Sequence, residues 1–363
     1  MFSIGNSVAL LALLAWPLAV FVMFRVLTIE RALIWSILGG YMILPQLSEI
    51  NLPGIPSFNK ETIPNLAAFA GCLYVIGRFP ALLPESGLGK LLLVVFVISP
   101  SVTVLTNLEP IMFGITTIGT LEMLDTSNLE RASLPGLRAY DAVSSLVNQL
   151  FVMLPFFLAR NILNTAKALH EVLVALVIAG LIYALPMLFE VRFSPQLHTM
   201  VYGFFQHDFI QAIRAGGFRP FVFMPHGIWV AFFAFMCTMA AAALMRQTPL
   251  PQRGRMVFLV LFMAGLLVLC KTLGAMLLAL VFLPILLLLQ PRSQLAVSAS
   301  IALGVLAYPL LRSSGLLPLD AILARLTGFN PDRAQSLDYR FTNEDLILEH
   351  VSQKMWFGWG GWG

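Results

Sequence analysis

The chain contains few charged residues. Only 11% of its 363 residues are Asp, Glu, Lys or Arg, whereas 59% are hydrophobic. Soluble globular domains carry about 25% charged residues, so this composition argues against a soluble fold. The chain also has no run of five or more basic residues, and nucleic acid is therefore not expected as a partner.

Cysteine is scarce as well, with three residues, Cys72, Cys237 and Cys270. Each lies in or at an apolar segment, and their spacing suits neither a disulfide framework nor a metal site. We interpret them as packing residues. Known hydrolase, nucleotide-binding and zinc-protease motifs are missing too, and the acids of the loops are dispersed. We therefore expect no metal ion and no cofactor.

No basic residue precedes the first apolar segment. The first cation, Arg25, follows that segment, which argues against a cleaved signal peptide. A helix flanked in this way is expected to insert with its N-terminus outside the cytoplasm.

What the chain does contain is a series of about ten apolar segments. A helix of about 20 residues crosses a hydrocarbon core of about 30 Å. Runs such as Leu277–Leu289 show no alternation of polarity, so helices are predicted rather than strands. We predict an all-α polytopic membrane protein with one transmembrane domain over residues 1–363. The predicted spans lie near 4–24, 31–48, 64–77, 88–106, 136–159, 168–189, 226–245, 256–270, 273–290 and 294–311, and the second, third and eighth are short.

The distribution of charge predicts the orientation of these spans. With the N-terminus outside, the inner loops hold ten cations and three acids, and the outer side holds twelve cations and fifteen acids. Cytoplasmic loops are expected to be rich in Lys and Arg. The two long loops, at about 190–225 and 312–355, are then predicted to lie on the outer side.

These outer loops carry cations that positive-inside topology does not explain. Arg214 and Arg219 lie in the first loop, Arg340 lies in the second, and Lys271 lies in a turn between two helices. A guanidinium can bind a diphosphate through two parallel hydrogen bonds, so we predict a diphosphate site here. Other interpretations remain open. Arg219 could contact lipid headgroups, Arg340 could pair with Glu344 on one helix face, and Lys271 is better explained as a turn residue.

Two histidines are candidates for proton transfer. His226 lies at the mouth of a predicted helix and His350 lies in the second long loop. Histidine can act as a general base at neutral pH. A hydrogen-bonded histidine at the membrane interface is the simpler interpretation of each.

Three further segments carry structural expectations. Residues 332–356 mix charged and apolar side chains, which predicts an amphipathic surface helix with its N-cap near Thr342 or Asn343. The stretch Ile111–Leu124 is expected to lie at the interface or to re-enter the membrane. The sequence ends in WFGWGGWG, so we expect that further spans have been truncated, and that the tryptophans belong to an interfacial belt.

Three motifs resemble those of the bacterial O-antigen ligase and polymerase family. They are GGFRPFVFMPHGIW (Gly216–Trp229), KTLGA (Lys271–Ala275) and YRFTNEDLILEHVSQKMWFGWGGWG (Tyr339–Gly363). They cover about residues 200–363 and appear in the family's order. Gly227 stands where the family commonly has Asn, and the proline of the last motif is missing.

The resemblance implies a glycosyltransferase of the bacterial inner membrane that makes surface polysaccharide, lipopolysaccharide or exopolysaccharide. In the family, arginines of the outer loops bind the undecaprenyl diphosphate of a lipid-linked glycan, and Arg219 and Arg340 match those positions. The other partners would be an acceptor glycan or lipid and the membrane lipids. A secondary transporter or lipid-linked glycan flippase is the alternative, and a non-catalytic partner of an export complex is a third possibility. A transporter would place ionisable residues along its spans, whereas Asp141, Glu171 and Lys271 lie near predicted span ends.

Overall fold

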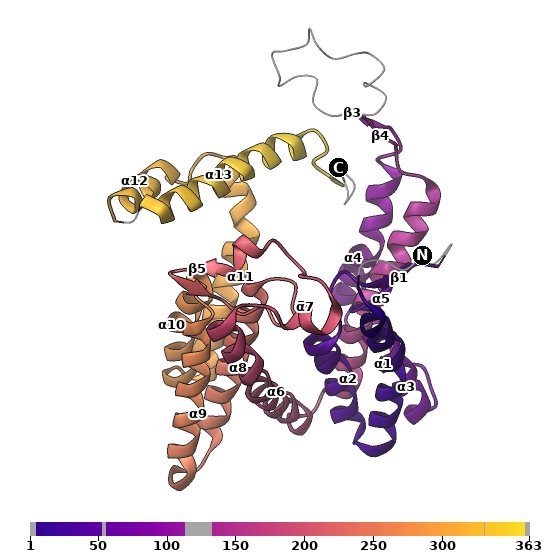
Figure 1. Cartoon of the computed structure of the whole chain (residues 1–363). Coiled ribbons are helices and arrows are strands. Elements are labelled where there is room, and N and C mark those ends of the chain that lie inside the picture. The colour runs from indigo at the N-terminus through magenta and orange to yellow at the C-terminus, as the bar shows by residue number, and fades with distance from the viewer. Residues whose placement is uncertain (1–4, 53–55, 113–132, 330, 360–363) are drawn as a thin grey trace. The chain divides into compact units, whose positions relative to one another are not determined.

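The computed structural model describes residues 5–52, 56–112, 133–329 and 331–359, and these are mostly helical (Figure 1). The α-helices are α1 (Ser7–Val26), α2 (Ile29–Ile43), α3 (Thr62–Ile76), α4 (Gly87–Leu105), α5 (Ala139–Ile162), α6 (Ala166–Phe193), α7 (Leu197–Tyr202), α8 (Gly227–Gln247), α9 (Leu250–Leu269), α10 (Leu273–Leu288), α11 (Pro291–Ser313), α12 (Leu319–Phe329) and α13 (Pro331–Ser352). A short 3-10 helix, η4, covers Phe209–Ala212.

Three two-residue antiparallel pairs are the β-structure of the described residues. They are β1 (Glu49–Ile50) with β2 (Phe58–Asn59), β3 (Ile111–Met112) with β4 (Ser133–Leu134), and β5 (Ile213–Arg214) with β6 (Gly217–Phe218). The predicted all-α class is therefore confirmed.

Each predicted span coincides with a helix. Among the described residues, seven helices are long and apolar enough to cross a membrane, namely α1, α4, α5, α6, α8, α9 and α11. The helices α2, α3 and α10 have 15, 15 and 16 residues. A multi-pass membrane protein is thus confirmed, and the count of ten spans stays a prediction. Helix α9 begins at Leu250, ahead of the predicted 256, so the eighth span is not short.

The two long loops contain more helix than the sequence suggested. Helices α7 and η4 lie within 190–225, and α12 and α13 lie within 312–355. The predicted N-cap of the second loop's helix was wrong, because α13 begins at Pro331 and Asn343 instead donates to Tyr339 O inside it. Proline suits the first position of a helix, where its missing N–H would have no helical partner. Most of Ile111–Leu124 lies outside the described residues.

The chain divides into two compact units. The first contains residues 1–90 and 147–289, and the second contains residues 91–146 and 290–363. Each is described by itself below.

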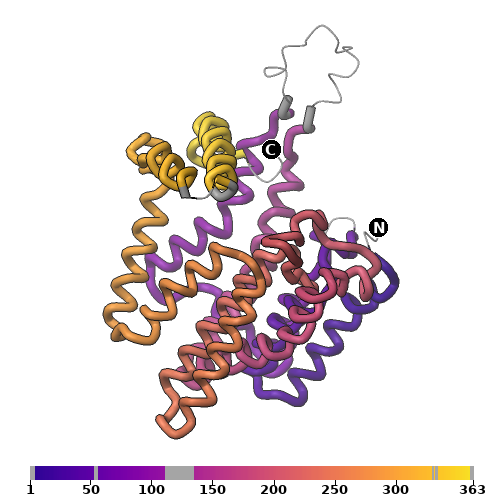
Figure 2. Tube along the Cα trace, turned by 60° about the vertical axis from the view of Figure 1, so that its left-hand side comes forward, coloured from indigo at the N-terminus to yellow at the C-terminus, as the bar shows by residue number. Residues whose placement is uncertain are grey.

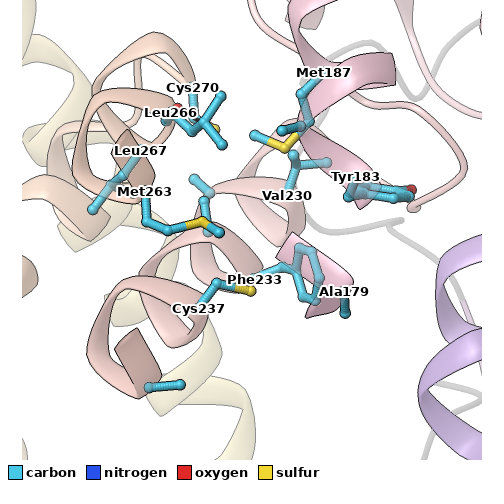
Figure 3. Close-up of a cluster of buried hydrophobic side chains, with 14 of the residues drawn as sticks. Ala179, Tyr183, Met187, Val230, Phe233, Cys237, Met263, Leu266, Leu267 and Cys270 are labelled. Carbon is cyan, nitrogen blue, oxygen red and sulfur yellow. Dashed lines mark hydrogen bonds between the residues drawn. The ribbon is translucent and has the colours of Figure 1, made fainter. Parts of the chain in front are cut away.

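The first unit has its largest core where α6, α8 and α9 pack together (Figure 3). Small residues let these helices approach closely, as is typical of membrane proteins. A Cβ built on Gly180 of α6 would lie only 2.9 Å from the Cβ of Cys237 in α8. Cys237 and Cys270 belong to this core, and Cys72 belongs to a second core of α1, α2, α3 and Leu158. All three cysteines are 0% exposed, which confirms them as packing residues.

In the second unit, α12 packs along α13 (Figures 1 and 2). The Arg312 guanidinium at the end of α11 binds Glu344 and Asp345 of α13. After α13, the Lys354 ammonium donates to Asn107 Oδ1 at 2.7 Å and to Thr106 O at 3.0 Å. These contacts tie α13 to α11 and to the end of α4.

Candidate functional site

The candidate site of the first unit is built around the segment Arg219–His226, called the Arg219 loop below. A hairpin precedes it, in which β5 and β6 are joined by Ala215 (φ 46°) and Gly216 (φ 69°). Two consecutive positive φ angles are typical of the tight turn that matches the twist of a hairpin. Figure 1 shows β5 near one end of the helices α8 and α10. The hairpin presents Arg214, whose side chain is exposed, and Arg219 N then donates to Ala212 O at 2.9 Å.

Arg219 is a buried cation without an acidic partner among the described residues. It is 3% exposed, and it takes part in none of the ion pairs that the described residues form. Its Nε is buried and has no hydrogen-bond partner in the described part of the chain. Its guanidinium lies 5.6 Å from the ring centre of Phe221. Burial, and then the charge of Arg214, lowers the pKa of Arg219 to about 10, so it stays charged at neutral pH.

Gly227 provides the space that the Arg219 side chain occupies. A Cβ built at Gly227 would lie 2.9 Å from both Cδ and Nε of Arg219. Real Cβ atoms rarely approach other atoms so closely, since protein interiors are packed without spare room. The glycine that departs from the family motif therefore has a local role in this chain.

His226 is the N-cap of α8 and faces two hydrogen-bond donors. Its Nδ1 accepts from Ile228 N at 3.1 Å, and its Nε2 lies 3.0 Å from Arg219 Nη2. A neutral imidazole has only one acceptor nitrogen, so it cannot accept both bonds. Burial, and then the charge of Arg219, lowers the pKa of His226 to about 4, so the protonated form is disfavoured as well. The site therefore has more N–H donors than its own side chains can satisfy.

Lys271 joins this cluster from the turn between α9 and α10. Its φ of 51° places it in the left-handed region, which agrees with the interpretation as a turn residue. Its Nζ lies 2.5 Å from the position that a Cβ on Gly217 would occupy, so the amine lies against the hairpin. The structure thus brings together four sequence-predicted residues of the first unit, Arg214, Arg219, His226 and Lys271.

Buried polar side chains hold the Arg219 loop in place. The Glu190 carboxylate accepts from the backbone N–H groups of Phe221 at 2.8 Å and Val222 at 2.7 Å. Gln206 Nε2 donates to the carbonyls of Val222 and Met224, both at 3.0 Å. Val222 has a φ of 51°, which is unfavourable for a β-branched residue and is typical of functional segments that their surroundings constrain.

These supporting residues were missed by the sequence reasoning. Glu190 directly follows the predicted span 168–189 and lies within α6. The signal available in the sequence was a carboxylate at the end of an apolar span. Glu190 is 1% exposed and also accepts from Leu197 N at 3.0 Å. An acid at a span end is usually solvated, so only the fold shows that it binds the backbone of a distant loop.

Arg340 and His350 lie on α13 in the second unit, and both side chains are exposed. Glu344, the alternative partner of Arg340, binds instead to Arg312 at 3.3 Å and to Tyr308 at 2.9 Å. The His350 ring stacks on Trp359 with their centres 4.3 Å apart. A shared site of Arg219 and Arg340 stays a prediction, as does a catalytic role of either histidine.

Metal ligands are not grouped in this protein as far as it is described, since no three His, Cys, Asp or Glu residues gather there. No family model, curated protein or solved structure matches the chain.

Proposed function

We propose that the chain is a membrane glycan polymerase or ligase. It would transfer a lipid-diphosphate-linked glycan to a sugar hydroxyl of an acceptor, on the outer side of a bacterial inner membrane. Arg219, assisted by Arg214 and Lys271, would bind the diphosphate, and Arg340 would add a second guanidinium. The observation that carries the proposal is the buried Arg219, which lacks an acidic partner among the described residues.

The electrostatics of the cluster support an anionic ligand. A buried charge is costly unless it is paired and hydrogen-bonded. Here one buried guanidinium lies near the charge of Arg214, Lys271 lies against the same hairpin, and the Arg219 Nε is unsatisfied in the described part of the chain. A diphosphate would supply both the compensating charge and acceptors for the surplus N–H groups.

The same cations would assist the transfer reaction. The acceptor hydroxyl attacks C1 of the donor sugar, the bond from C1 to the diphosphate oxygen breaks, and lipid diphosphate leaves. Negative charge develops on the leaving oxygen, and cations held in place beforehand stabilise it without reorganisation. The bonds from Glu190 and Gln206 to the Arg219 loop support such a fixed arrangement.

His226 and His350 are the candidates for accepting the hydroxyl proton. His226 is neutral at physiological pH, as a base must be, but both of its ring nitrogens face N–H donors. Binding of an anion would draw Arg219 Nη2 toward the ligand. His226 would then accept the hydroxyl proton at Nε2 in the tautomer that carries a proton on Nδ1, which gives up the N-cap bond from Ile228 N. This step connects diphosphate binding with proton transfer.

The test is transfer by purified protein in proteoliposomes that contain a lipid-diphosphate-linked glycan and its acceptor. Arg219→Ala should lower the rate of product formation at least about 100-fold, as loss of an oxyanion-stabilising donor does. Arg219→Lys should recover only part of it, because an ammonium lacks the planar pair of donors. Arg253→Ala changes an exposed arginine in the first turn of α9 and is the matched control.

Each outcome separates the candidate functions. Wild-type product from Arg219→Ala, at equal protein level, would remove the assigned site. Movement of the lipid-linked glycan across the bilayer without any product would favour the flippase alternative instead.

A further inference from the structure

A pocket of about 420 Å³ lies in the first unit beside the Arg219 loop, lined by residues of α2, α3, α5 and α8 and by the segments before α3 and α8. Small-molecule sites usually enclose about 300–1,000 Å³. Its lining contains Pro225, which directly precedes His226, so the pocket borders the Arg219 loop.

Lys60 lies at the polar end of the pocket. It is 6% exposed, and its Nζ donates to Leu44 O at 2.8 Å and to Phe223 O at 2.5 Å. Burial lowers the pKa of Lys60 to about 7, although the neighbouring Glu61 acts in the opposite direction. The two carbonyls take two N–H groups, so the third position on Nζ remains for a ligand in the pocket, as an N–H of the ammonium or as the lone pair of the neutral amine.

Two aromatic rings form the walls beside this polar end. The Tyr41 and Trp229 ring centres are 6.5 Å apart, and their planes are inclined by 52°. Trp229 is 53% exposed although it lies at the start of an otherwise well-buried helix, so its ring is available to a ligand. The amides of Gln46 and Asn65 and the carboxylate of Glu61 complete the polar lining.

An adjoining groove helps to define the chemistry of the ligand. It has about 550 Å³, shares Tyr41 and Trp229 with the pocket, and is otherwise lined by Ile228, Phe232 and Met236. Polar side chains therefore line only the Lys60 side of the two rings. A ligand with many hydroxyl groups is suited to that side, whereas an alkyl chain is suited to the other.

We propose that the Lys60 pocket binds one pyranose ring of a saccharide, stacked on Trp229 and Tyr41 and hydrogen-bonded to Lys60, Gln46 and Asn65. The C–H face of a sugar ring is weakly positive and suits the negative face of an aromatic ring. Its hydroxyls both donate and accept hydrogen bonds, which suits amides and an amine better than it suits a cation cluster. That this saccharide is the acceptor glycan rests on the proposed function, since the pocket and the cation cluster border the same loop.

The experiment uses the full chain in phosphatidylcholine nanodiscs, because sugar-headed detergents would compete for the pocket. Saturation-transfer NMR would be recorded with the methyl glycosides of glucose, galactose, mannose and N-acetylglucosamine. At least one should receive saturation on its ring protons. Sorbitol, which has similar hydroxyls but no ring to stack, should receive almost none.

Variants locate the binding site. Trp229→Ala should reduce the glycoside signal at least about fivefold, because it removes the ring on which the sugar stacks. Tyr41→Leu, a second variant on a different helix, should reduce it as well. Trp356→Ala removes the most exposed tryptophan of the described residues and should leave the signal unchanged.

The outcomes separate this proposal from the proposed function. No saturation with any glycoside, or equal saturation in Trp229→Ala and wild type, would overturn the saccharide pocket even if transfer activity is intact. Conversely, Arg219→Ala should retain the glycoside signal while transfer is lost. Displacement of the glycoside by a single-chain phospholipid would assign the pocket to a lipid and would also overturn it.

Discussion

The Arg219 loop and helix α13 each carry one arginine that the sequence offers to a diphosphate, and they present it in opposite ways. The loop buries its arginine near Arg214, with Lys271 against the same hairpin, and side chains from distant segments bind its backbone. Helix α13 exposes Arg340 to its surroundings, while the nearby acids bind Arg312 instead. A buried guanidinium requires a counter-charge, whereas an exposed one is already solvated. Burial therefore makes Arg219 the stronger candidate, although both arginines lie in motifs that resemble those of the same family.

The largest effect is expected for a substitution of Arg340, the exposed arginine of the two. If α13 supplies the second diphosphate ligand, Arg340→Ala should lower glycan transfer by at least about 100-fold, the same loss that is expected for Arg219→Ala. Because the side chain is exposed, the unfolding temperature should stay unchanged. Arg325→Ala in α12 removes another exposed arginine of the same unit and should transfer normally. Normal transfer by Arg340→Ala would leave Arg219 as the only ligand of the pair.

The next-largest effect concerns the buried side chains that hold the Arg219 loop in place. The exposed Arg340 on α13 has no comparable support among the described residues. Glu190→Ala should lower the free energy of unfolding by about 3 kcal/mol or more, because three backbone N–H groups lose their acceptor at about 1–3 kcal/mol each. Glu171→Ala is the matched control on the same helix, since its pair with Arg31 is partly exposed and such pairs contribute about 0–1 kcal/mol. Thermal unfolding in detergent measures both. Equal shifts would show that Glu190 does not support the loop.

A smaller effect is expected from filling the space under Arg219. Gly227→Ala would place a Cβ against Arg219 Cδ and Nε, so the guanidinium must move. Misplacement of a positioning group by about 1 Å can lower a rate up to about 100-fold. We expect a loss of transfer of about tenfold with little change in protein level. A Cβ at Gly274, in the first turn of α10, would meet nothing within 4 Å. Gly274→Ala should therefore leave the rate of transfer unchanged.

The smallest effect is a pH dependence of stability at His226. Its pKa falls from the usual 6.5 to about 4 in the folded protein, so folding favours the neutral ring. The stability that this ring contributes is fully present above about pH 6.5 and is lost as the pH falls toward 4. His226→Asn keeps an N-cap side chain but cannot titrate. The unfolding temperature of the wild type should therefore fall more steeply than that of His226→Asn between pH 6.5 and 4, and parallel curves would contradict the assignment.

Much of the helical framework was predictable because it depends on local composition. Every predicted span coincides with a helix, since an apolar segment in lipid must satisfy its backbone bonds internally. The start of α13 was mistaken because Thr342 and Asn343 looked like caps, whereas Pro331 begins the helix eleven residues earlier. Several residues in a segment can resemble an N-cap, and contacts outside the helix decide at which of them the helix begins.

The candidate site was predictable in its residue types but not in its arrangement. The sequence by itself determined that Arg214 and Arg219 lie in a loop between apolar spans and that His226 and Lys271 lie at span ends, because polar and charged side chains are costly in lipid. Only the tertiary structure decided that Arg219 is buried over Gly227, that Glu190 and Gln206 bind the loop, and that Lys60 reaches Phe223. Those contacts join segments that are far apart in the chain. Whether a polar group is buried, and which donor or acceptor then satisfies it, depends on packing between these segments, which no local pattern of residues specifies.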